Sequence, residues 1–139
     1  MKVAITTTIG VVGGFISYLF GGWTASITTL LILMIIDYVS GLIVAGVFHK
    51  SPKSETGSLE SKAGWKGLCR KFITLVFVIV ANRIDMEMGT TFIRDAVCIS
   101  FIVNELISLI ENAGLMGVPI PKVIKNAIDV LNKKANGDE

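Results

Sequence analysis

A few ionisable side chains interrupt segments that are otherwise apolar, and these are the residues best placed to do chemistry. Asp37 lies in the first long apolar stretch, and Arg94, Asp95 and Glu105 lie in the last one. An ionised group at the centre of a bilayer costs at least ~2.5 kcal/mol, so such groups face a partner or water. We therefore expect these residues to pair with opposite charges or to line an aqueous interior.

Two arrangements satisfy these charges, and the sequence leaves both open. In the first, Asp37 meets the stripe of Arg94, Asp95 and Glu105 in a wet interior or at an oligomer interface. In the second, Arg94 or Arg83 neutralises a nearby acid within one protomer. The residues assigned to a pore or to assembly are Asp37, Gly41, Ala45, Arg94, Asp95, Asn104, Glu105 and Glu111. For Glu111, close to a helix end, solvation at the membrane interface is the favoured interpretation.

The apolar stretches that carry these residues predict membrane helices. Val3 to Ile36 is a run of thirty-four residues without a charge, whereas one crossing needs ~20 apolar residues for ~30 Å of hydrocarbon. The apolar character continues from Tyr38 to Phe48, and Gly21-Gly22-Trp23 offers a turn with an interfacial aromatic residue. The predicted result is a helical hairpin of about 3–20 and 24–48.

Two further spans are expected at about 68–84 and 91–112. The first is short, so Arg70, Lys71 and Arg83 must send their charged ends toward the interfaces. The second is interrupted by charges, and at ~100° per residue Arg94 and Glu105 fall on one stripe while apolar residues cover most of the rest. The stripe consists of Arg94, Cys98, Phe101, Glu105, Ser108 and Asn112.

The fold class that follows is an all-α integral membrane protein, forming a single membrane domain over 1–139. It has about four transmembrane helices, or three with a peripheral segment, and a C-terminal amphipathic helix at 119–134. Composition agrees, because hydrophobic residues make up 52% of the chain, charged residues 17%, and the mean hydropathy is +0.69. These values lie on the membrane side of ordinary globular usage.

A basic segment at 49–71 predicts the orientation. Six basic residues against two acidic ones give it a charge of +4, and short basic loops stay on the cytoplasmic side. The residues read as topology markers are Lys62, Lys66, Arg70 and Lys71. The next polar connection, Asp85-Met86-Glu87, carries only acids, so it faces the other way. Both termini are then expected in the cytoplasm.

Small residues predict where helices approach one another, since close backbone contact drives packing in lipid. Gly10 and Gly14 form one ridge of this kind, and they are read as helix-packing positions. Gly41 and Ala45 form another, one turn beyond Asp37 and on its face.

The tail at 119–134 predicts an amphipathic helix. Its apolar face consists of Ile120, Val123, Ile124, Ala127, Val130 and Leu131, and its polar face of Lys122, Lys125, Asn126, Asp129 and Lys133. Such a helix suits an anionic membrane surface. Docking on the rest of the chain is an equally ordinary outcome, and the sequence does not separate the two.

Catalytic chemistry finds little support. His49 is the only histidine, no Cys/His cluster has metal spacing, and no glycine-rich loop matches a phosphate cradle. We expect no enzyme, no catalytic or metal-binding residue and no cofactor. The basic segment between two spans is more simply a topology determinant than a nucleic-acid site.

Five short motifs in order resemble one family, the small toxin-secretion/phage-lysis holins of Gram-positive bacteria and their phages. They are Asp37-Tyr38-Val39-Ser40-Gly41, Gly64-x-x-Gly67-x-x-Arg70-Lys71, Arg94-Asp95, Asn104-Glu105-x-x-Ser108-x-x-Glu111-Asn112 and Gly117-x-Pro119-x-Pro121. The match runs from about Ile36 to Leu131. The N-terminal arm carries no such motif, and the basic loop is longer than in many members.

The resemblance implies a non-enzymatic protein that forms large homo-oligomers in the cytoplasmic membrane. Its lesions would release an endolysin or a toxin at a programmed time. Two other classes stay open on the residues alone. One is a membrane regulator that recruits a cytoplasmic partner without forming a pore, and the other is a small ion or solute transporter. The transporter is less favoured, because repeated broken helices are absent from the sequence.

Overall fold

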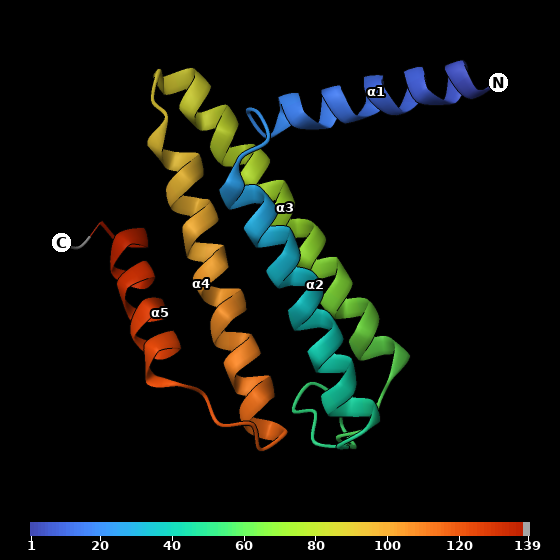
Figure 1. Ribbon diagram of the computed structural model, residues 1–139, viewed down its shortest axis with the longest axis vertical. Helices are drawn as coiled ribbons and strands as arrows, with labels where there is room; N and C mark the ends of the chain where they lie inside the picture. Colours follow the sequence, from blue (N-terminus) through green and yellow to red (C-terminus); the bar gives the residue numbers. More distant parts are fainter. Residues whose placement is uncertain (138–139) are drawn as a thin grey trace.

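The computed structural model describes residues 1–137, and within them the chain forms five α-helices and no strand. The helices are α1 (Lys2–Leu19), α2 (Ala25–Gly46), α3 (Ser61–Met88), α4 (Phe92–Leu115) and α5 (Lys122–Ala135). The all-helical fold class is thus confirmed. Helices α2, α3 and α4 run side by side as a bundle, and α5 packs against α4 (Figure 1).

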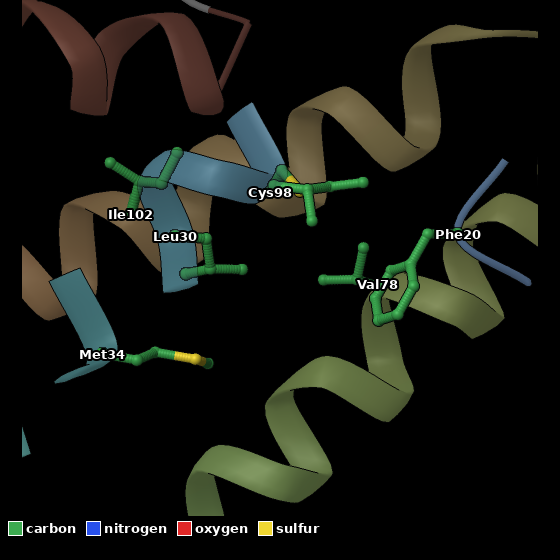
Figure 2. Packing of buried hydrophobic residues seen from close by; sticks show 7 residues of the cluster. Phe20, Leu30, Met34, Val78, Cys98 and Ile102 are labelled. Atoms are coloured by element: carbon green, nitrogen blue, oxygen red, sulfur yellow. The ribbon is translucent and has the colours of Figure 1, made fainter. Parts of the chain in front are cut away.

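The core of the bundle lies where α2, α3 and α4 meet. Leu30 and Val78 are fully enclosed there, and Phe20 enters from the segment just after α1 (Figure 2). The buried cluster consists of Phe20, Ile27, Leu30, Met34, Val78, Cys98 and Ile102. These residues recur at helical spacing on each helix, which is why one face of each can close on the others.

The helix α1 does not form the predicted hairpin with α2. None of its residues is buried, and it leaves the end of the bundle at a wide angle (Figure 1). The physical reason is the turn at Gly21, whose backbone φ of +76° and surrounding contacts fix the exit direction. The small-residue ridge of Gly10 and Gly14 accordingly faces open space.

The helix α3 begins earlier than the sequence predicts. The basic segment at 49–71 is a loop only as far as Glu60, and residues 61–71 are the first three turns of α3. The acidic segment at 85–87 is likewise helical, and the connection to α4 is the short stretch after Met88. The charged residues at both ends of the apolar stretch therefore extend the helix rather than end it.

The outside of the bundle is unusually apolar. Ile35 on α2 and Phe72 and Phe77 on α3 are more than half exposed, with exposed fractions of 63%, 66% and 54%. By length and composition, α1 and α2 qualify as membrane-spanning helices. A membrane protein built from apolar helices is the coarse prediction that this surface supports.

Candidate functional site: a buried charge cluster

Three charged side chains from three helices meet inside the bundle. Lys71 Nζ of α3 lies 2.8 Å from Asp37 Oδ2 of α2 and 2.7 Å from Glu105 Oε2 of α4. Both carboxylates are buried, and the lysine is largely so, with 17% of its side chain exposed. We refer to Asp37, Lys71 and Glu105 as the charge cluster. One ammonium is thus shared by two carboxylates.

Two uncharged side chains, Asn112 and Ser40, complete the surroundings of Asp37. Asn112 Nδ2 donates to Asp37 Oδ1 at 3.1 Å and to Ser40 Oγ at 2.8 Å. Ser40 Oγ in turn donates to the backbone oxygen of Asp37 at 2.9 Å. Both carboxylate oxygens of Asp37 therefore have a donor, as buried polar groups require. Gly41 lies beside this arrangement, and a Cβ there would be in ordinary contact with Asn112 Nδ2, at 3.8 Å.

The glycines of the third helix bring α3 close to α2 beside the charge cluster. Tyr38 lies over them, and its hydroxyl donates to the backbone oxygen of Gly64 at 3.3 Å. A Cβ on Gly64 would come within 3.3 Å of that hydroxyl, and a Cβ on Gly67 within 3.6 Å of the ring. Gly64 of the motif Gly64-x-x-Gly67-x-x-Arg70-Lys71 thus has a packing reason, since a Cβ there would be tight against Tyr38, whereas a Cβ at Gly67 would make an ordinary contact.

The charge cluster borders a cavity of about 200 Å³. Residues from α2, the 49–60 loop, α3 and α4 line it, so it extends from the cluster toward the basic loop. Its polar lining includes Arg70, Asn104 and Ser108, and its narrow wall includes Gly41 and Ala45. The arrangement can hold water and exchange ion-pair partners. It offers no nucleophile paired with a base.

A second polar group lies at the other end of the bundle and binds backbone atoms. Arg94 Nη1 donates to the oxygens of Phe20 at 3.1 Å and Gly21 at 2.7 Å, and Asn82 Nδ2 donates to the oxygen of Leu19 at 3.2 Å. A Cβ on Gly21 would collide with the Asn82 side chain and lie 2.8 Å from Arg94 Nη1. The last carbonyl of α1 is thereby satisfied by α3, and the two carbonyls that follow it are satisfied by α4.

Asp85 completes this second group by capping α4. Its carboxylate accepts from the backbone N–H of Ile93 at 3.0 Å and of Arg94 at 2.8 Å, and from the Thr90 hydroxyl. A carboxylate at a helix N-terminus satisfies unpaired donors and suits the helix dipole. We refer to Asn82, Asp85 and Arg94 as the junction clamp, because together they fix how α1, α3 and α4 meet.

Comparison with known proteins decides the family. The model of the bacteriophage holin family matches residues 14–133, which is most of the chain. The chain belongs to the bacteriophage holin family. That family is one of non-enzymatic membrane proteins, which confirms both the resemblance and the prediction that the chain is not an enzyme.

Individual relatives agree with the family. A probable holin of Bacillus phage phi105 is 35% identical over 116 residues, covering 83% of this chain and 79% of the relative. An uncharacterized protein of Halalkalibacterium halodurans is 39% identical over 145 residues, covering the whole chain and 98% of the relative. An uncharacterized 14.9 kDa protein of Clostridium perfringens is 36% identical and covers 88% of both chains. No solved structure matches the chain.

The structure of this holin-family chain divides the predicted site residues into separate groups. Asp37 and Glu105 meet through Lys71, and Gly41, Ala45 and Asn104 lie around the adjoining cavity.

Arg94 and Asp95 do not join the charge cluster. They lie about 16 Å from Glu105 along α4 at ~1.5 Å per residue, and they pair with each other at 3.2 Å. Glu111 is exposed near the end of α4.

Lys71 belongs to the site, but the sequence predicts it only as a topology marker, together with Lys62, Lys66 and Arg70. A signal was available. If the helical period of α3 is continued upstream of Phe72, one face of the helix carries Lys71, Val78, Asn82 and Asp85. The last three of these are buried. A lysine on that buried face requires an acidic partner from another helix.

Proposed function

We propose that this chain acts as a holin. It accumulates as a homo-oligomer in the cytoplasmic membrane of a bacterial host and forms lesions that release an endolysin or a toxin. Membership of the bacteriophage holin family carries the proposal, and the likeness to a probable phage holin supports it. The buried charge cluster among apolar helices adds a physical basis, because it provides polar groups within a bundle that lipid surrounds.

The proposed topology has four crossings with both termini in the cytoplasm. Helices α2, α3 and α4 cross as one bundle. The helix α1 crosses as a separate arm, which requires it to turn at Gly21 and Gly22 away from the wide angle that it makes with the bundle in Figure 1. The length and apolar composition of α1 and α2 support their crossings. For α3 and α4 the support is that one charge of each, Lys71 and Glu105, is paired inside the bundle, which lowers the cost of placing these two groups in lipid.

The proposed mechanism starts from a protomer whose charges are satisfied internally. In that state Lys71 neutralises part of the charge of Asp37 and Glu105, so the bundle is tolerated in the membrane. When protomers assemble, the helices rearrange so that Asp37, Glu105, Arg94 and Asp95 line water. Gly10 and Gly14 on the uncovered α1 allow close approach of helices during assembly.

The test is inducible expression in a bacterium with and without a co-expressed cytoplasmic muralytic enzyme. Turbidity, viability and a potential-sensitive dye are followed. We expect abrupt loss of membrane potential and viability after a delay, and lysis only when the muralytic enzyme is present. Normal growth and potential at a high membrane level of the protein would contradict the proposal and favour a recruiter without a pore.

A further inference from the structure

The C-terminal helix α5 is attached to the bundle by a narrow strip of its surface. Ile128, which the sequence-based apolar face omits, is its one buried residue, and Leu131 is half-buried. Val123 and Val130 belong to the same apolar side, yet they are 78% and 66% exposed. Docking on α4 therefore leaves one apolar edge of α5 uncovered.

The charges of α5 are also uncovered. Its four lysines, Lys122, Lys125, Lys133 and Lys134, outnumber the single acid Asp129, and all five side chains are exposed. The ion pairs found among residues 1–137 involve none of these lysines. The helix consequently presents a strong positive charge beside an exposed apolar edge, which is the pattern of helices that lie on anionic membranes.

The linker before α5 holds it loosely. Gly117 adopts a φ of +79°, and Pro119 and Pro121 contribute no backbone N–H. Backbone hydrogen bonds tie residues 116–118 to the end of α4, and the next ones begin inside α5. Side-chain packing is thus the main attachment of α5 to α4.

The docked position conflicts with an α4 that crosses the membrane. Figure 1 shows α5 directed back along α4, beside its middle, so its exposed lysines would face hydrocarbon. We propose that α5 leaves α4 when the bundle is inserted and binds the anionic phospholipid surface at the cytoplasmic face, through its lysines and its Val123–Val130 edge. This inference rests on the proposed function, because it requires that α4 crosses the membrane.

The positive charge of α5 favours an anionic lipid surface as its binding partner. Lysine stems can lie along apolar surface while the ammonium groups reach lipid phosphates. Valine side chains on the same edge then enter the acyl boundary. Ile128 and Leu131, released from α4, would widen this apolar side.

The test measures the distance between spin labels on α4 and α5 in the full-length protein. Ser100→Cys and Asn132→Cys are labelled in a Cys69→Ser background, where Cys98 is only 1% exposed and is shielded from the reagent. Distances are recorded in neutral detergent, in phosphatidylcholine vesicles and in vesicles that also contain phosphatidylglycerol. We expect one short distance in detergent and a longer one that dominates in the anionic vesicles.

Variants sharpen the result. Replacing the four lysines of α5 with glutamine should restore the short distance in anionic vesicles, whereas Lys50→Gln with Lys53→Gln in the loop should change nothing. An unchanged distance in all three environments would overturn the release of α5. Equal lengthening in neutral and anionic vesicles would overturn the binding of α5 to anionic lipid. A short distance between copies that each carry only the Asn132→Cys label would assign the α5 surface to a second copy and also overturn the proposal.

The proposed function is checked separately in the same vesicles. Labelling of Thr91→Cys and Val118→Cys, at the two ends of α4, from opposite sides reports whether α4 crosses. If α4 crosses but α5 stays docked, the inference fails while the topology stands. If both positions are labelled from one side, the proposed topology fails first.

Discussion

The charge cluster and the junction clamp are both polar groups inside an apolar bundle, yet they satisfy different partners. In the charge cluster, Asp37, Lys71 and Glu105 bind one another across three helices beside a cavity. In the junction clamp, Asn82, Asp85 and Arg94 bind mainly backbone atoms at helix ends. Backbone partners fix the shape of the fold, whereas side-chain partners can be exchanged when helices rearrange.

This difference assigns the two groups different tasks. Loss of the junction clamp should disturb the direction of α1 and the start of α4 but leave the charges of the bundle paired. Loss of one member of the charge cluster should leave an unpaired charge in the interior. Substitutions in each group, with neighbouring controls, can therefore separate the two tasks.

The largest effect is expected for Lys71→Leu. It leaves two buried carboxylates without their shared ammonium, and breaking a buried ion pair in this way costs about 3–5 kcal/mol. We expect a strong fall in the midpoint of thermal unfolding in detergent and in the amount of protein in the membrane. Lys66→Leu, at an exposed position of the same helix, is the control. Equal midpoints for the two variants would contradict a pairing role for Lys71.

A smaller effect is expected for Gly21→Ala, which places a methyl group against the junction clamp. The methyl group meets the Asn82 and Arg94 side chains, and a left-handed conformation costs a non-glycine residue about 1–3 kcal/mol. Gly22→Ala shares a positive φ but has open space around its Cβ position, so it isolates the collision. We expect a lower midpoint of thermal unfolding for Gly21→Ala than for Gly22→Ala. The reverse order would contradict the role of the junction clamp.

Asp85→Ala should have the smallest effect of the three. It removes the acceptor for the first N–H groups of α4, and loss of a helix cap costs about 0.5–2 kcal/mol. Hydrogen exchange should speed up at Ile93 and Arg94 while the exchange of α2 is unchanged. Glu87→Ala, exposed on the same helix, should leave both unchanged. Slow exchange at the start of α4 in the Asp85 variant would show that other groups provide the cap.

The helical class, the amphipathic tail and the family are readable from the sequence because they depend on local periodicity and motif order. The sequence also predicts the turn at Gly21-Gly22, but it does not predict the direction of α1. That direction depends on Arg94 and Asn82, which lie more than sixty residues away in the chain. The sequence predicts Lys71 only as a topology marker for a related reason. A lysine at the edge of an apolar stretch is expected to be solvated unless an acidic partner far away in the sequence is known.

The most direct test of the account follows lysis timing in the inducible co-expression system with Glu105→Leu. Removing this carboxylate leaves Lys71 paired only with Asp37 and takes away a polar group that assembly would expose to water. Glu111→Leu, at an exposed site on the same helix, is the matched control. The account predicts that Glu105→Leu shifts or abolishes the abrupt loss of membrane potential while Glu111→Leu keeps the parental timing. Parental timing for Glu105→Leu at a normal membrane level would contradict the role of the charge cluster.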